Sequence, residues 1–454
     1  MAQTFPYSLN LYGYISYTYN SFGDLGTGTQ LGGWSSNNDV YAFSGYQNPQ
    51  DKPYGGVQLA TGTTVYTLAG NDSISSTLNA ISSTGLQSSG TTALMIGGSL
   101  YMGDGADSLI GKYSLVNYSG STSTTYYSAF SVYGLYNKGF IDTGAGDDYL
   151  EGSSVVSLPS SDPSGLPYLT YLNLYGLYNS GTIALGIGND TIYAKADARV
   201  NSIAQALVNT GTINLGDGSD KITIDGGISS PYLVNSNIID LGSGDDSIIF
   251  NRNGYFQNKG TIRLGAGVDS ITGAVVRLSN DGSLDFGDGN NILSTYTLNN
   301  SGSLVFGSGD DSVRNASILG LSNGGTFALG AGNDTLDCIG STTNFFGGLA
   351  TPTSTSGFVD FGDGNDTLIG YGRGVVQGGA GLDRILLPAS GYQVKTYSGY
   401  CTIAQLQSNG TPSLKPITAY GFELIGSATN PANSFTPSDG SYLIGADGSI
   451  SKLI

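Results

Sequence analysis

The feature that most constrains this chain is an internal repeat built on two glycines and an acid. The pattern Gly-x-Gly-x-Asp occurs ten times, and residues 131–150 align with residues 173–192 without a gap. A variant that ends in Asn291 and a shortened copy that ends in Asp72 bring the total to twelve. Such repetition indicates a solenoid, in which each coil must stack on its neighbours to bury its apolar side.

A second corner accompanies most of the copies at a constant distance. Seven asparagines each stand two residues before a glycine, and that glycine lies five residues before the first glycine of the acidic turn. Between the two corners, apolar and polar residues alternate as in a short strand with one buried face. We expect the stacked asparagines to form an amide ladder. They are Asn137, Asn179, Asn209, Asn258, Asn280, Asn300 and Asn323.

The remainder of each repeat varies in length, which indicates loops. Successive acidic positions lie 35, 41, 42, 30, 26, 23, 22, 20, 23, 32 and 17 residues apart. Gly, Ser, Thr, Asn and Tyr dominate, and good helix formers are scarce. We therefore predict an all-β fold, a right-handed parallel β-roll or β-solenoid with one Gly-x-Gly-x-Asp turn per coil, capped at both ends. The predicted regions are a Tyr-rich N-terminal cap at 1–66, a solenoid of about twelve coils at 67–387, and a β-rich C-terminal cap and export-signal region at 388–454.

Composition excludes several classes of function. The chain has no histidine, which removes Ser-His-Asp catalysis and histidine metal ligands within one chain. Its net charge of −18 and the lack of a basic run argue against sequence-specific nucleic-acid binding. No stretch approaches the roughly 18 apolar residues of a membrane span, and the N-terminus lacks the pattern of a cleaved secretory signal.

The acidic residues point to a metal. All but Glu151 and Glu423 of the 34 acidic residues are aspartate, the acid that turns and oxygen-ligand loops favour. Stacked turns would place carboxylates about 5 Å apart, where like charges repel by about 1 to 3 kcal/mol. Calcium removes this repulsion, since it takes six to eight oxygens, whereas magnesium prefers a smaller octahedron. Roughly ten calcium ions would nearly neutralise the chain.

The turns resemble the calcium-binding repeats of the RTX (repeats-in-toxin, hemolysin-type) family of bacterial and cyanobacterial secreted surface proteins. The resemblance covers roughly residues 68–387 and implies a β-roll with each ion between consecutive turns, held by the acid and backbone carbonyls. This chain departs from the family by having one motif per long coil, and Leu or Phe often replaces the first glycine of the family's doublet, as at Leu185 and Phe361. The implied metal-site residues are Asp72, Gly103, Gly105, Asp107, Gly144, Gly146, Asp148, Gly186, Gly188, Asp190, Gly216, Gly218, Asp220, Gly242, Gly244, Asp246, Gly265, Gly267, Asp269, Asn291 (a weaker site), Gly307, Gly309, Asp311, Gly330, Gly332, Asp334, Gly362, Gly364, Asp366, Gly379, Gly381 and Asp383.

These observations predict a secreted calcium-binding protein that is structural or adhesive at a bacterial cell surface, matrix or filament, and that is not an enzyme. Residues 421–425 resemble tails that follow calcium repeats and carry a C-terminal signal for type I export. Calcium, further copies of the chain and surface glycans are the expected partners. The 31 tyrosines indicate strand packing or, alternatively, a glycan-binding face.

Three points stay open at this stage. The alternative function is a calcium-stabilised β-helix enzyme of the polysaccharide lyase or epimerase type, with Asp and Tyr or Lys in place of histidine. Glu151 and Glu423 are 272 residues apart and are not expected to form a catalytic pair. Cys338 and Cys401 could pair or stay free.

Overall fold

The computed structural model describes residues 15–18, 24–25, 40–47, 57–59, 61–62, 64–80, 91–116, 130–157, 172–198, 203–226, 232–273, 275–316, 321–338, 344–345, 358–413 and 416–453. All regular secondary structure in these ranges is β-strand, so the all-β prediction is confirmed. Within the same ranges, no helix is long and apolar enough to span a membrane. The chain divides into unit 1 (Met1–Gly242 and Ile248–Gly254) and unit 2 (Ser243–Ser247 and Tyr255–Ile454).

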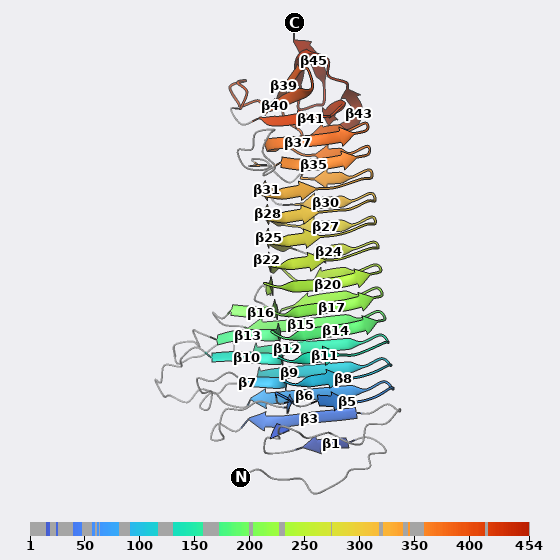
Figure 1. The fold of residues 1–454 in the computed structure, drawn as a ribbon. Helices are drawn as coiled ribbons and strands as arrows, with labels where there is room; N and C mark the ends of the chain where they lie inside the picture. Colours follow the sequence, from blue (N-terminus) through green and yellow to red (C-terminus); the bar gives the residue numbers. More distant parts are fainter. Residues whose placement is uncertain are drawn as a thin grey trace, which may run out of the picture. The chain divides into compact units, whose positions relative to one another are not determined.

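Unit 1 is a parallel β-solenoid whose coils pass in turn through three sheets, A, B and C (Figure 1). Its sheet A contains β1 (Ile15–Thr18), β3 (Val40–Gln47), β6 (Ser73–Ala80), β9 (Ser108–Val116), β12 (Tyr149–Ser157), β15 (Thr191–Ala198) and β18 (Lys221–Asp225). Sheet B contains β2 (Asp24–Leu25), β4 (Val57–Leu59), β7 (Thr91–Ile96), β10 (Phe130–Asn137), β13 (Leu172–Asn179), β16 (Ile203–Asn209) and β19 (Tyr232–Asn235). Sheet C contains β5 (Thr64–Tyr66), β8 (Ser99–Tyr101), β11 (Phe140–Asp142), β14 (Thr182–Ile187) and β17 (Thr212–Asp217). The sequence boundaries of the units fall within or beside β20 (Ile238–Ser243), β21 (Ser247–Phe250) and β22 (Gly254–Asn258).

The core of unit 1 consists of columns of aliphatic side chains that repeat once per coil. Each column is a set of register partners, and its members have no solvent exposure. Because side chains alternate across a strand, the residues between them point outward. The columns are Leu109, Leu150, Ile192 and Ile222 in sheet A; Leu135, Leu177 and Leu207 in sheet B; and Ile141, Ile183 and Ile213 in sheet C.

Unit 2 has the same coil pattern and ends in antiparallel strands. Sheet A contains β24 (Ser270–Gly273), β27 (Ile292–Thr295), β30 (Ser312–Asn315), β33 (Thr335–Asp337), β36 (Thr367–Ile369), β38 (Arg384–Leu387), β42 (Leu424–Ser427) and β43 (Asn430–Phe435). Sheet B contains β25 (Val276–Asn280), β28 (Thr297–Asn300) and β31 (Leu321–Asn323). The third sheet contains β23 (Thr261–Arg263), β26 (Ser283–Asp285), β29 (Ser303–Val305), β32 (Thr326–Ala328), β34 (Asn344–Phe345), β35 (Phe358–Asp363), β37 (Gly372–Ala380), β39 (Tyr392–Tyr397), β40 (Tyr400–Gln405), β41 (Ile417–Tyr420), β44 (Gly440–Ile444) and β45 (Ile450–Leu453). Antiparallel pairing begins with β39 and β40.

From β6 to β33, the differences in coil length fall at one place in the coil, the connection from sheet A to sheet B. In unit 1 this connection spans residues 117–129 after β9 and 158–171 after β12, whereas in unit 2 a single residue, Tyr296, joins β27 to β28. The other two corners keep their length. This separation explains why the sequence repeat has a fixed part and a variable part.

The structure answers one of the open points about individual side chains. Cys338 and Cys401 are both buried and free, so they do not pair. On the outer face of sheet B, Tyr133 stacks on Tyr136 and on Tyr175, with ring centroids 4.8 Å apart in both pairs. Most of the predicted N-terminal cap at 1–66 lies outside the described residues.

Candidate functional site

The glycine-acid turns connect sheet C to sheet A in every complete coil, and they stack along one edge of each unit (Figure 1). Gly144 and Gly146 have φ angles of 92° and 142°, which L-residues rarely adopt. A Cβ on Gly144 would also lie 1.9 Å from the carbonyl oxygen of Gly103 in the turn below. Glycine is therefore required twice over. All the predicted turn glycines except Gly307 share a positive φ.

The predicted metal-ligand acids point into the stack of turns, where each is at most 2% exposed. In unit 1 the Oδ1 atom of Asp107 accepts the backbone N–H of Asp72 at 2.7 Å, and Asp148, Asp190 and Asp220 extend this row at 2.7–2.8 Å. In unit 2 an equivalent row links Asp246, Asp269, Asn291, Asp311, Asp334, Asp366 and Asp383 at 2.7–2.9 Å. The structure thus brings the predicted acids together, one per coil.

Glu423 ends the row of unit 2. Its Oε2 atom accepts the backbone N–H of Asp383 at 2.8 Å, so it takes the place that the acid of a following coil would fill. The repeat pattern predicts no role for Glu423. Because its turn has no Gly-x-Gly-x-Asp spelling, the repeat alone could not reveal it.

The second carboxylate oxygen is the unusual feature of these rows. In six of the acids, Oδ2 is buried and receives no hydrogen bond: Asp107, Asp190, Asp269, Asp334, Asp366 and Asp383. Burial raises the pKa of Asp107 to about 8 and the pKa values of Asp190, Asp334 and Asp366 to about 7, because the ionised form loses its hydration. Each such oxygen needs a proton or a nearby cation to offset the cost of burying its negative charge.

Asn291 shows what this second position faces. Its Oδ1 accepts the N–H of Asp269 at 2.9 Å, as an aspartate would, and its Nδ2 donates to the carbonyl oxygen of Gly287 at 3.2 Å. An aspartate in that place would direct an oxygen at the carbonyl of the first turn glycine. Two acceptors would then face each other, an arrangement that a shared cation stabilises.

The donor set is one acid per turn together with backbone carbonyls. Among the described residues, no three His, Cys, Asp or Glu side chains are grouped so as to hold a metal ion. An ion in these turns would therefore take most of its ligands from the main chain, and the carbonyl groups of the turn glycines are available for this.

The asparagine corner, between sheets B and C, forms the predicted amide ladder. Asn179 donates from Nδ2 to Oδ1 of Asn209 at 2.8 Å and to the carbonyl oxygen of Thr212 at 3.0 Å. The prediction is confirmed here and in unit 2, where Asn258, Asn280, Asn300 and Asn323 form the same chain of bonds at 2.8 Å. Asn235 also belongs to the ladder, although the sequence pattern missed it because Asn237 stands where the other corners have glycine.

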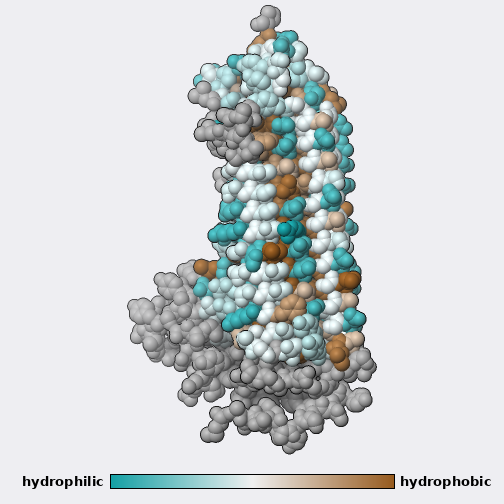
Figure 2. Space-filling view, viewed as in Figure 1, coloured by the Kyte–Doolittle hydropathy of each residue, from teal (hydrophilic) through white to brown (hydrophobic). Residues whose placement is uncertain are grey.

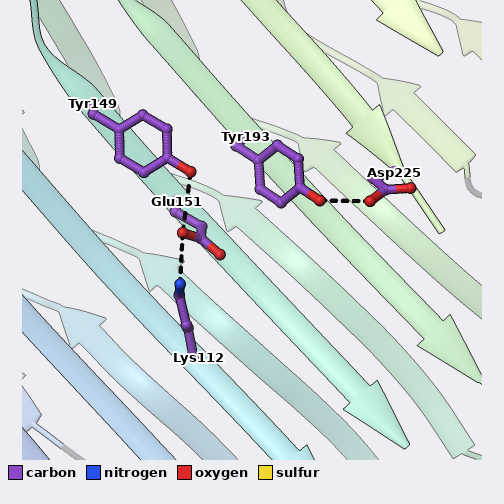
Figure 3. Close-up of polar contacts among 5 residues, drawn as sticks. All are labelled: Lys112, Tyr149, Glu151, Tyr193 and Asp225. Carbon is purple, nitrogen blue, oxygen red and sulfur yellow. Dashed lines mark hydrogen bonds and ion pairs between the residues drawn. The ribbon is translucent and has the colours of Figure 1, made fainter. Parts of the chain in front are cut away.

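A separate polar cluster lies on the outer face of sheet A in unit 1 (Figure 3). The carboxylate of Glu151 accepts the phenol of Tyr149 at 3.1 Å and lies 2.9 Å from Nζ of Lys112. Nearby, the carboxylate of Asp225 accepts the phenol of Tyr193 at 2.5 Å and lies 3.6 Å from Nζ of Lys195. Sequence reasoning did not find this cluster, because its members come from four coils separated by loops of different length.

Comparisons of the chain with protein-family models, with curated proteins and with solved structures gave no match.

Proposed function

We propose that the chain is a secreted, calcium-binding, right-handed β-solenoid that serves as a structural or adhesive component of a bacterial cell surface, extracellular matrix or filament. The observation that supports this most is the row of buried carboxylate oxygens without a hydrogen-bond donor. An ionised carboxylate that is buried without a hydrogen-bond donor or a cation destabilises the fold, because burial of an uncompensated charge is costly. A divalent ion at each turn removes that cost for two neighbouring coils at once.

Calcium suits these turns better than other common ions. The acids and the carbonyl of the first glycine in each turn would hold it, and these hard oxygen ligands exclude the softer transition metals. Magnesium demands a compact octahedron and keeps its waters, which a dry turn does not offer. Calcium bound here would supply positive charge, while the chain's own residues fix the spacing of the turns.

Calcium dependence also supports a location outside the cell. At a calcium concentration about 100-fold above the dissociation constant, each site would add about 2.7 kcal/mol to the free energy of unfolding. Extracellular modules have dissociation constants of about 0.1 to 1 mM, so the same sites would contribute little at cytosolic calcium. We propose that the chain leaves the cell largely unfolded by C-terminal-signal type I export and folds outside.

A calcium titration of the full chain tests the proposal. Circular dichroism should show strand content that rises with calcium and falls when a chelator is added, while titration calorimetry should count roughly ten ions. Magnesium at the same concentration is the control and should have a much smaller effect. Unchanged strand content in chelator, with no heat of calcium binding, would show that protons rather than ions occupy the rows and would remove the proposal.

The variant Asp190→Asn separates ion binding from folding. Asn291 shows that an asparagine fits the row, so the variant should fold and bind one ion fewer. A variant that folds and still binds the full number of ions would contradict the assignment of Asp190 as a ligand.

A further inference from the structure

The cluster on sheet A of unit 1 has its acids beneath its cations. The side chains of Glu151 and Asp225 are 9% and 15% exposed, whereas those of Lys112 and Lys195 are 43% and 30% exposed. The carboxylates therefore orient the ammonium groups and the phenols, as Figure 3 shows for Lys112, Tyr149 and Tyr193, and the ammonium groups are more exposed than the acids. This polarity is the reverse of the chain as a whole, whose net charge is −18.

The cationic groups follow the register of the coils. Lys112 pairs with Ser153, and Ser153 pairs with Lys195, so the two lysines stand in one column two coils apart. In another column, Tyr149 pairs with Thr191, and Thr191 pairs with the exposed Lys221. Neighbouring strands are about 4.8 Å apart, which is close to the advance of one sugar in an extended polysaccharide. A sugar chain that crossed the strands would present one residue to each coil.

We propose that this face, formed by Lys112, Tyr149, Tyr193, Lys195 and Lys221, binds an acidic polysaccharide of the polyuronate class. Exposed ammonium groups attract sugar carboxylates, and half-exposed tyrosine rings pack against the apolar faces of sugars. Nucleic acid suits this face less well. Double-stranded DNA carries a charge every 1.7 Å or so, and a chain of net charge −18 repels such a dense anion more strongly than a polyuronate with one charge per sugar.

The phenols act as hydrogen-bond donors in this cluster. Burial, followed by the adjoining carboxylates, raises the pKa values of Tyr149 and Tyr193 above that of free tyrosine, so both phenols stay protonated at neutral pH and donate to those carboxylates. Figure 2, seen from the same side as Figure 1, shows hydrophilic side chains with single apolar ones scattered among them, which is ordinary for an exposed protein surface. The inference gives the adhesive role under "Proposed function" a defined partner, and it uses none of the glycine turns.

The test measures binding of a short oligogalacturonate, too short to gel with calcium, to the full calcium-loaded chain by titration calorimetry. The native chain should bind it, and added salt should weaken binding. Lys195→Gln and Lys221→Gln should each weaken binding by about tenfold, because each removes one charge-assisted contact. Lys259→Gln removes the same charge from an exposed corner in unit 2 and should leave binding unchanged. Circular dichroism of every variant checks that it is folded.

Several results would overturn the inference. Absence of binding, an equal loss with Lys259→Gln, or equal binding of a neutral malto-oligosaccharide or of duplex DNA would each do so. Release of unsaturated uronate products, which absorb in the ultraviolet, would show that the face is a lyase active site and not only a binding site. The calcium titration distinguishes the two proposals: a chain that folds with calcium but ignores the sugar refutes only this inference, and a chain that binds the sugar without responding to calcium refutes only the proposed function.

Discussion

The two constant corners of each coil solve the same stacking problem with different side chains. At the asparagine corner, every side chain offers both a donor and an acceptor, so Asn209 bonds to Asn235 and to the carbonyl of Ile238 with nothing added. At the acidic corner, an ionised Asp190 offers only acceptors, and its Oδ2 atom stays without a donor. The asparagine corner therefore satisfies its hydrogen-bonding groups within the protein, whereas the acidic corner requires a proton or a cation.

Asn291 is an asparagine at a position where the other acidic turns have aspartate, so the chain already contains one natural replacement of acid by amide. It occupies an acidic position, yet it satisfies both of its side-chain groups within the protein. The neighbouring bonds in the row keep their lengths of 2.7–2.9 Å. The hydrogen bonds of the row therefore depend on the shape of the side chain and not on its charge. The negative charge of each aspartate is then available to bind a cation.

The largest effect is expected from pH in the absence of calcium. The acids have folded-state pKa values of about 6 to 8, above the roughly 3.9 of an unfolded aspartate. The folded state therefore holds protons that the unfolded state releases, so the stability of the calcium-free chain is greatest below about pH 4 and is lost as the pH rises through 6 to 8. Thermal melts in chelator should show Tm falling by on the order of 10 °C over this range.

The same melts in calcium provide the contrast. Calcium binds the ionised acids, so the increase in Tm that it causes should grow with pH. A chelator-treated chain whose Tm rises from pH 4 to pH 8 would contradict the comparison between the corners, because its acidic corner would then be complete without protons or ions.

The next largest effect is expected from Asn209→Asp. This change replaces the Nδ2 donor of a fully buried side chain by an oxygen, so the bonds to Asn235 and Ile238 are lost and two acceptors oppose each other. We expect the free energy of unfolding to fall by about 3 kcal/mol or more in denaturant titrations at pH 7. Asp190→Asn is the matched control and should cost less than about 1 kcal/mol in chelator. If both variants lower the free energy of unfolding equally, the amide donor is not what makes the asparagine ladder stable without an added proton or cation.

Asn291→Asp should bring a smaller gain. It restores a carboxylate between Asp269 and Asp311, so the chain should bind one more calcium ion. At saturating calcium the variant should be stabilised by about 2 to 3 kcal/mol, while in chelator at pH 7 it should be less stable than the native chain. Calorimetry and melts measure both quantities, and an unchanged ion count would argue that this turn cannot hold calcium.

The smallest effect is expected from removal of the terminal acceptor. Glu423→Ala leaves the backbone N–H of Asp383 without its partner, which should cost about 1 kcal/mol. Glu423→Gln keeps an acceptor oxygen and should be nearly neutral. If the two variants lose stability equally, the charge of Glu423 rather than its hydrogen bond is what matters.

The sequence repeat predicted the parallel coils, the one acid per turn and the amide ladder, because these depend on local spacing that every coil shares. It did not predict that Oδ1 of each acid accepts a main-chain N–H of the preceding coil, since this depends on how the turns stack. The Lys112 and Glu151 pair was hidden for a related reason. Its members lie 39 residues apart, across the loop at 117–129, and only the register of β9 with β12 brings them together.

From β6 to β33, length differences are confined to the connection between sheets A and B, which makes that connection a natural insertion point. Sequence added there does not alter the inward columns or either corner, because among the described residues the paired strands and the two hydrogen-bonded corners link each coil to its neighbours. A foreign epitope grafted between β12 and β13 would therefore be displayed without cost to the ladders. Over evolutionary time the same freedom lets such a protein change these connections while its two stacked corners stay constant.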